Sequence, residues 1–101
     1  MDPVSYEWDD AKRAENLAKH GVDFRAATRF DWDVALINPD TRYNYGEPRF
    51  IAHGPINGRL YVLIYTRRYP SRRIISLRKA NRREQAGYAA AILARLARGR
   101  T

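Results

Sequence analysis

The first third of the chain has the spacing of short helices that begin and end at recognisable residues. Apolar residues at helical intervals predict a helix over about residues 10–20, with Asp9 as its N-cap and Gly21 as its left-handed end. Asp23 then caps a second short helix, predicted over residues 24–30, in which the apolar residues share one face. We therefore expect two N-terminal helices before any long strand.

From residue 35 onward the pattern becomes that of short apolar strands separated by turn residues. The predicted strands cover residues 35–37, 49–53, 60–66 and 73–77. The third of these is apolar on both faces, which predicts a central position in the sheet. Residues 6–8 form either a further short strand or an apolar staple ahead of the first helix.

A final helix is predicted to begin after Asn81, because Glu84 follows at the spacing of a capping box. Its apolar stripe comprises Tyr88, Ala89, Ile92, Leu93 and Leu96. Together the elements predict an α+β fold with two N-terminal helices, an antiparallel sheet of three to five strands and a C-terminal helix. Helices packed on one face of this sheet would complete a single domain over residues 1–101.

Charge is divided unevenly along the chain. The net charge is +8, but the first 50 residues have seven basic and ten acidic side chains, whereas residues 51–101 have twelve basic side chains and one acidic. Eleven of these twelve are arginine, whose planar guanidinium matches the oxygens of a phosphate. The imbalance favours a nucleic acid or another polyanion as the partner over a merely solvated basic surface.

The composition also excludes several kinds of site. No cysteine is present, so disulfides, zinc–thiolate centres and thiol nucleophiles are excluded. Two distant histidines and scattered carboxylates do not form a ligand set, so we expect no metal and no cofactor. The longest apolar run, residues 60–65, is too short for a bilayer, and the N-terminus lacks the features of a signal peptide. We expect a cytoplasmic protein that does not bind a membrane.

The last predicted hairpin gathers arginines. Arg67 and Arg68 end one strand and Arg72 and Arg73 begin the next, so a hairpin would bring the four together. The residues themselves indicate only a basic surface suited to RNA; if such a protein cleaves RNA without a metal, the reaction needs cations on the phosphate, a base for the 2′-hydroxyl and an acid for the leaving oxygen. We predict Arg68, Arg73 and Arg78 as a phosphate clamp, with ion pairing to the acidic first half of the chain as the alternative.

For proton transfer the sequence offers His20, His53, Glu47, Glu84 and Tyr88. We select Glu47 and His20 as catalytic candidates. The alternative for Glu47 is an ion pair with Arg49, and the alternative for His20 is a cap at a helix C-terminus, which would raise its pKa. The simplest role of Glu84 is the capping box. The expected RNA contacts are Arg49, Arg67, Arg72, Lys79, Arg83 and Tyr88.

Several segments between residues 6 and 88 match motifs that occur together in one protein family. Residues 8–24 follow W-D-x-x-K-x-x-x-N-x-x-K-H-G-V-x-F, and residues 47–54 follow E-x-R-F-x-x-x-G. Residues 73–80 are similar to R-I-I-S-A-R-x-A, and Glu84 and Tyr88 match the first and last positions of the E-R-x-x-Y motif at the start of the last helix. In combination these motifs resemble the BrnT toxins.

The resemblance implies a type II toxin, an endoribonuclease of RelE-like fold that blocks translation. It also implies a partner antitoxin, BrnA, expected in a 2:2 heterotetramer that binds DNA only through the antitoxin. Two positions depart from the family pattern: Arg67 replaces the glutamate of T-E-R, and Gln85 replaces the arginine of E-R. Any acid–base role of that glutamate is missing here, but the other arginines are intact, so we expect activity to survive.

Two other classes of function stay open from the residues alone. A non-catalytic RNA- or DNA-binding module would need only the charge. A structural half of a repressor complex would use its basic surface to dock an acidic partner. A helix-turn-helix repressor fits less well, because the basic residues lie in the strands and at the start of the last helix. RNA cleavage distinguishes these classes.

Overall fold

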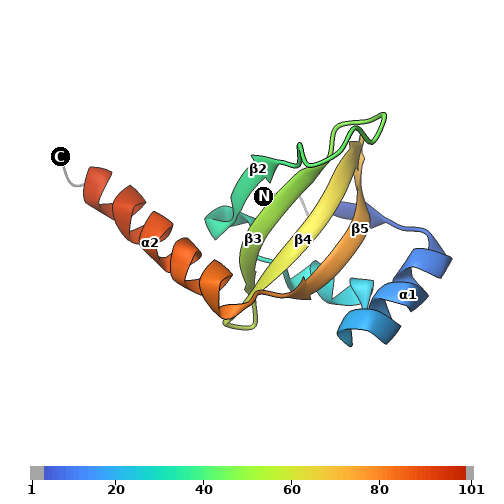
Figure 1. The fold of residues 1–101 in the computed structure, drawn as a ribbon, viewed down its shortest axis with the longest axis horizontal. Coiled ribbons are helices and arrows are strands. Elements are labelled where there is room, and N and C mark those ends of the chain that lie inside the picture. Colours follow the sequence, from blue (N-terminus) through green and yellow to red (C-terminus); the bar gives the residue numbers. More distant parts are fainter. Residues whose placement is uncertain (1–3, 100–101) are drawn as a thin grey trace.

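The computed structural model describes residues 4–99, which form one sheet with helices on both sides (Figure 1). In chain order the elements are β1 (Ser5–Glu7), α1 (Asp10–His20), the 3₁₀ helices η1 (Phe24–Arg29) and η2 (Trp32–Val34), β2 (Leu36–Pro39), β3 (Phe50–Ile56), β4 (Arg59–Arg68), β5 (Ser71–Lys79) and α2 (Arg82–Arg98). The strands lie in the order β1-β5-β4-β3-β2. The central position predicted for the third apolar run is therefore confirmed, because that run is β4.

The local signals at both α-helices are confirmed. The Asp9 carboxylate accepts hydrogen bonds from two backbone N–H groups of the first turn of α1, and Gly21 ends this helix with a φ of 70°. At the start of α2, Asn81 and Glu84 make both hydrogen bonds of a capping box. These ends depend on short-range contacts, which is why the sequence alone locates them.

The second N-terminal helix is a 3₁₀ helix, which corrects the expectation of two ordinary helices at this end. Phe24, Ala27 and Phe30 are all buried, and they recur at every third position. A helix with three residues per turn stacks such positions on one face, whereas an α-helix would rotate them apart. The burial of all three side chains therefore favours the tighter helix.

The sheet is mixed rather than antiparallel. β2 to β5 form an antiparallel meander, but β1 pairs in parallel with the start of β5, with Ser5 opposite Ser71 and Glu7 opposite Arg73. Residues 6–8 thus contribute to a strand rather than only to a staple. The direction of the short strand β1 depends on which edge of the sheet is free to pair with it. The local sequence pattern does not indicate which edge is free.

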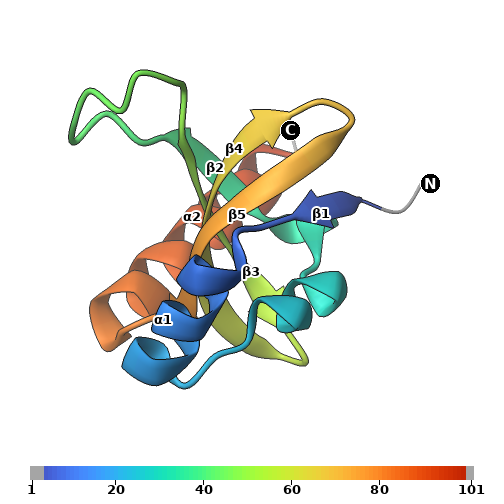
Figure 2. The ribbon, with the colours of Figure 1, turned by 90° about the vertical axis from the view of Figure 1, so that its right-hand side faces the viewer.

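The two faces of the sheet are covered differently. The two 3₁₀ helices cover one face, α1 packs beside β5 at the edge of the sheet, and α2 contacts one end of the other face, where Tyr88 packs against Leu60 and Val62. Figure 2 shows α2 and the 3₁₀ helices on opposite sides of the sheet. The expectation that all helices share one face is wrong, because the alternation in β4 places apolar residues on both faces and α2 covers Leu60 and Val62 of the second set. The fully buried side chains beneath the N-terminal helices include Phe24, Leu63, Tyr65, Ile74 and Leu77.

The second half of α2 extends beyond the sheet (Figure 1). Of its predicted apolar stripe, Tyr88 and Ile92 are partly buried, whereas Leu93 and Leu96 are 66% and 59% exposed. The larger part of the sheet face on this side therefore stays open. Within residues 4–99, no helix is long and apolar enough to cross a membrane.

Replacing Gly54 by alanine is expected to destabilise the fold by about 1–3 kcal/mol. A Cβ atom at this buried position in β3 would lie 2.5 Å from Cζ of Phe30, and the core leaves that ring little room to move. Urea unfolding followed by tryptophan fluorescence measures the change. Gly87→Ala is the matched control, because a Cβ at Gly87 meets no atom within 4 Å and alanine favours the helix. Equal midpoints for Gly54→Ala and the wild type would contradict the expectation.

Candidate active site

The hairpin between β4 and β5 brings the four predicted arginines together, but strand alternation divides them between the two faces. Thr66 lies opposite Arg73, and Arg67 lies opposite Arg72. Residues directly opposite each other share a face, and neighbours along a strand alternate. Arg68 and Arg73 therefore lie on the open face, and Arg67 and Arg72 lie on the face covered by the N-terminal helices.

Arg67 and Arg72 pack on aromatic rings of the covered face. The Arg72 guanidinium lies 3.8 Å from the centroid of the Trp32 ring, and Arg67 lies 4.6 Å from that of Phe50. Such cation–π contacts stabilise the core edge. We leave both arginines out of the candidate site. Arg67 is the residue that replaces the glutamate of the family's T-E-R motif, so this departure from the family pattern lies outside the candidate site.

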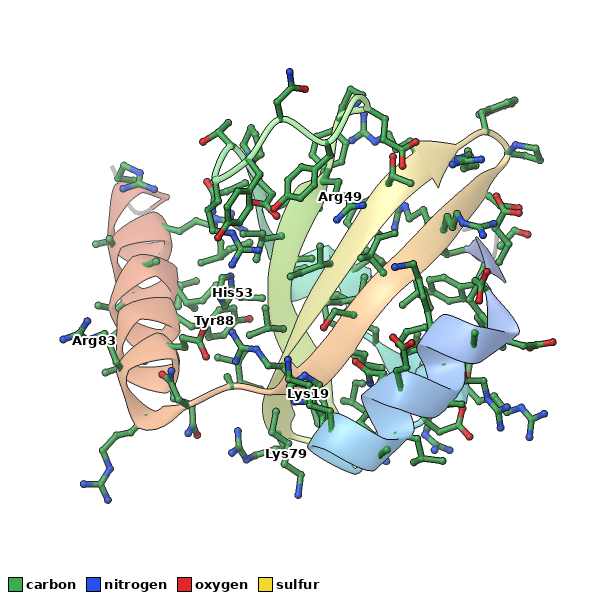
Figure 3. All side chains as sticks on the ribbon, turned by 45° about the vertical axis from the view of Figure 1, so that its right-hand side comes forward. Lys19, Arg49, His53, Lys79, Arg83 and Tyr88 are labelled. Atoms are coloured by element: carbon green, nitrogen blue, oxygen red, sulfur yellow. The ribbon has the colours of Figure 1, made fainter. Side chains whose placement is uncertain are left out.

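Four arginines on the open side of the sheet form the surface that we call the arginine face, namely Arg49, Arg68, Arg73 and Arg78. Arg49 comes just before β3, where Phe50 turns inward to stack on Tyr65, so alternation directs Arg49 outward over the sheet (Figure 3). Its guanidinium lies 4.0 Å above the ring of Tyr45. The row Arg49, Thr66, Arg73 crosses β3, β4 and β5, which spans about 10 Å at the usual strand spacing.

Two arginines of this face have carboxylate partners that a phosphate can displace. Arg68 Nη2 lies 3.2 Å from Oε2 of Glu47, and Arg73 Nη1 lies 3.7 Å from Oε2 of Glu7. Each single contact is partly exposed, and exposed ion pairs contribute little to stability. Both guanidinium groups keep N–H donors free to bind an anion.

Arg78 is held more tightly. Two of its nitrogens each donate to one carboxylate oxygen of Glu84 at 2.8 Å, and this fork lowers the pKa of Glu84 to about 2. Nε2 of His53 lies 4.0 Å from the same carboxylate. Burial lowers the pKa of His53, although Glu84 opposes the shift. Glu84 therefore acts as an ionised cap and positions Arg78, and it is poorly suited to give or take protons near neutral pH.

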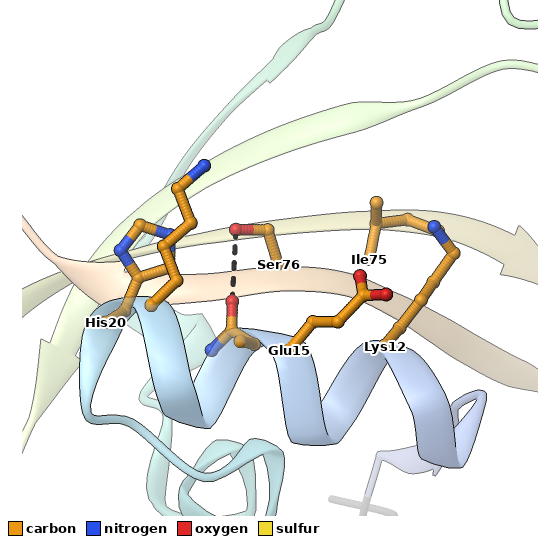
Figure 4. A pocket seen from close by; sticks show the side chains of 7 residues that line it. Lys12, Glu15, His20, Ile75 and Ser76 are labelled. Carbon is orange, nitrogen blue, oxygen red and sulfur yellow. Dashed lines mark hydrogen bonds between the residues drawn. The ribbon is translucent and has the colours of Figure 1, made fainter.

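His20 lies at the end of α1, in a shallow groove between that helix and the edge of β5 (Figure 4). The expected rise of its pKa at the helix C-terminus is wrong. Burial lowers the pKa of His20, and the positive charges of Lys19 and Arg78 add to this shift. The imidazole is therefore neutral at pH 7 and able to accept a proton.

The same groove contains two cations that the sequence analysis did not select. Lys12 and Lys19 both line it, together with His20 and Ser76. Their spacing of seven residues corresponds to two helical turns, so they share one face of α1. That spacing, with His20 following Lys19 directly, is the signal in the sequence that could have identified them.

The remaining candidates lie in different places. Lys79 is opposite Tyr61 in the register and so belongs to the covered face. Arg83 points away from the sheet (Figure 3). The Tyr88 hydroxyl donates a hydrogen bond of 2.6 Å to the carbonyl of Val34, which leaves its ring beside the open face. Within residues 4–99, no group of three His, Asp or Glu side chains is arranged to hold a metal ion.

Stability is expected to fall as the pH is lowered from about 5 to 2. The carboxyl groups of Asp23, Asp40 and Glu84 each have a pKa of about 2, against ordinary values of 3.8 for Asp and 4.5 for Glu, chiefly because an arginine donates to each. A depressed folded-state pKa stabilises the protein above the unfolded-state pKa, and that contribution is lost as the pH falls through the folded-state value. Thermal unfolding at several pH values measures the loss. A midpoint that stays constant from pH 5 to 2 would contradict it.

Comparisons with known proteins identify the family of this chain. The family model described as the ribonuclease toxin BrnT of type II toxin–antitoxin systems matches residues 8–84, a range that contains the whole arginine face. The crystal structure of the Brucella abortus ribonuclease toxin BrnT is similar, with a TM-score of 0.62, 27% sequence identity and coverage of 78% of this chain and 99% of that one. No curated protein sequence matches the chain. Because the family model matches well over half of its residues, the chain belongs to the BrnT family of ribonuclease toxins of type II toxin–antitoxin systems.

Proposed function

We propose that this chain cleaves RNA internally and without a metal ion, with the scissile phosphate held on the arginine face. The observation that carries the proposal is the set of four guanidinium groups on one open face of the sheet. In the proposed reaction the 2′-oxygen bonds to phosphorus and the bond to the 5′-oxygen breaks. The products are a 2′,3′-cyclic phosphate and a 5′-hydroxyl. Fixed guanidinium groups stabilise the charge that grows on the phosphoryl oxygens.

We assign the scissile phosphate to the part of the face over Ser76, between Arg73 and Arg78 on β5. His20 lines the groove that reaches Ser76, and its neutral imidazole can take the proton of the 2′-hydroxyl. The leaving 5′-oxygen is protonated from solvent on this open side. Lys12 and Lys19 extend the positive surface along α1.

Arg68 and Arg49 extend the surface in the other direction and would bind neighbouring phosphates of the RNA. Glu47 is then a positioning residue, because its carboxylate lies 3.2 Å from Arg68 and orients that guanidinium. The path runs diagonally across the sheet, from α1 to the loop before β3. A path of this kind makes affinity depend strongly on salt, because bound phosphates release their counterions.

Incubation of the antitoxin-free protein with end-labelled RNA in EDTA tests this function. We expect discrete products that end in 2′,3′-cyclic phosphate. Arg83→Ala is the matched control, expected to cleave at the wild-type rate because its side chain points away from the sheet. Intact RNA in the presence of folded wild-type protein would contradict the proposal. Salt-sensitive binding without products would instead favour a non-catalytic RNA-binding module.

We further propose that cleavage inhibits translation in the cytoplasm and that a BrnA-type antitoxin neutralises it in a 2:2 complex. Membership of a type II toxin family implies an antitoxin partner, and the net charge of +8 favours an acidic one. In this proposal DNA is bound only through the antitoxin. Light scattering of the co-expressed pair should give the mass of two copies of each protein. A toxin that stays monomeric beside its antitoxin would contradict the proposal.

A further inference from the structure

A cavity of about 290 Å³ lies between α2 and the strands β2 and β3, on the same side of the sheet as the arginine face. Its lining includes Leu36, Asn38, His53, Gly87, Tyr88 and Ala91. Figure 3 shows His53 and Tyr88 close together in the space between α2 and the sheet. We propose that this cavity binds one nucleobase of the RNA and that Asn38 and His53 recognise it. The inference rests on the proposed function, because the base belongs to the RNA held on the arginine face.

Two of the polar groups around the cavity are already engaged. Both carboxylate oxygens of Glu84 accept from Arg78, and the Tyr88 hydroxyl donates to the carbonyl of Val34. In the described part of the chain, the side chains of Asn38 and His53 make no hydrogen bond, and His53 lies 4.0 Å from Glu84 and near the positive charge of Arg78. Asn38 and His53 are therefore the side chains that can bind an occupant.

The other walls suit a flat aromatic ring. Leu36 and Ala91 are apolar, Tyr88 supplies a ring face, and Gly87 has no side chain. The volume of about 290 Å³ is just below the usual range for small-molecule sites, roughly 300–1,000 Å³. A single heterocycle with apolar faces and polar edges has this shape, and aromatic side chains commonly stack unpaired bases of single-stranded RNA.

The distance from the proposed scissile phosphate to the cavity is short enough for one nucleotide to span. His53 is opposite Val62, and Val62 is opposite Arg78. The row crosses two strand spacings, which is about 10 Å, and Glu84 contacts both of its ends. A nucleotide whose phosphate lies beside Arg78 can therefore place its base in the cavity.

Neither Asn38 nor His53 is charged at neutral pH, and uncharged side chains suit hydrogen bonding to base edges. The Asn38 amide offers donors and an acceptor, and a neutral imidazole offers one of each. Burial lowers the pKa of His53, which keeps the ring neutral. Bidentate hydrogen bonds of an amide to a base edge can discriminate strongly against the wrong base.

Cleavage of four RNAs that differ in one base near a single cleavage site tests the inference. The wild-type protein is expected to prefer one base by about 10-fold or more, the discrimination that a pair of base-edge hydrogen bonds gives. Asn38→Leu, which removes the amide, and Gly87→Leu, which fills the cavity, should each reduce this preference to about 2-fold or less. Ala90→Leu on the same helix is the matched control and should keep the preference. A wild-type preference unchanged in Asn38→Leu and Gly87→Leu would overturn the inference.

A binding measurement separates this inference from the proposed function. NMR titration of the ¹⁵N-labelled protein with AMP, GMP, CMP and UMP should shift the Asn38 side-chain amide and the backbone amide of Gly87, and the shifts should vanish in Gly87→Leu. If RNA stays intact but these shifts occur, catalysis fails and the nucleobase site stands. If RNA is cut but no nucleotide shifts these signals and the four RNAs are cut equally, the nucleobase site fails and the ribonuclease stands.

Discussion

Replacement of Arg73 by alanine is expected to slow RNA cleavage by about 10²–10³-fold, the loss typical of removing one fixed donor to transition-state charge. Arg73 ends the row Arg49, Thr66, Arg73 on β5 and borders the assigned phosphate position over Ser76. Its one contact with Glu7, at 3.7 Å, contributes little to folding. Single-turnover rate constants for a defined RNA, compared with thermal unfolding, separate chemistry from stability.

Two further variants test whether a loss of cleavage in Arg73→Ala comes from the Arg73 guanidinium itself. Arg73→Lys keeps the charge but loses the planar fork, so its rate should lie between those of the alanine variant and the wild type. Arg72→Lys changes the neighbouring arginine on the opposite face, where it stacks on Trp32, and should alter stability more than cleavage. A wild-type rate in folded Arg73→Ala would remove Arg73 from the active site and contradict the assigned phosphate position.

Replacement of Asn16 by alanine is expected to lower the free energy of unfolding by about 3–5 kcal/mol, a large part of the 5–15 kcal/mol typical of a domain. The Asn16 amide nitrogen donates to the carbonyls of Val22 and Leu77, and its oxygen accepts from the backbone N–H of Leu77. Because β1 pairs only with the start of β5, Leu77 lies on a free strand edge. The Asn16 side chain fills the place of the missing strand.

Urea unfolding followed by tryptophan fluorescence measures this loss. Asn16→Asp keeps an acceptor but removes both donors, so it should be destabilised as well. Glu15→Ala, at the exposed neighbouring position of α1, should change stability by less than about 0.5 kcal/mol. An Asn16→Ala midpoint equal to that of Glu15→Ala would show that the hydrogen bonds to β5 do not hold α1 to the sheet.

The expected effects of replacing Arg73 and Asn16 depend on contacts that the sequence predicts to different degrees. Asn16 belongs to a motif shared with the BrnT family, yet its contact with Leu77 joins residues 61 positions apart. Arg73 was selected from its charge and its place in a hairpin, and the structure adds that it shares the open face with Arg68. His20 was selected for its titration, but its pKa shifts opposite to the helix-end expectation, chiefly because the ring is partly buried, with smaller contributions from the charges of Lys19 and Arg78.

The sequence by itself determined the features that depend on neighbours within a few residues. The ends of α1 at Asp9 and Gly21, the capping box of Asn81 and Glu84 and the hairpins of the meander all follow from short-range hydrogen bonds and backbone preferences. The excess of arginine in the second half likewise indicated a phosphate-rich partner without any coordinates.

Only the tertiary structure decided which residues share a surface. A strand directs alternate side chains to opposite faces, and the sequence of β5 places arginine and apolar residues on both, so the choice depended on where α1, η1 and η2 pack. That packing stacked Arg72 on Trp32 and left Arg73 on the open face. The same non-local contacts made β1 parallel and placed α2 on the far side, because burial of apolar surface is settled by the whole sheet and not by any one segment.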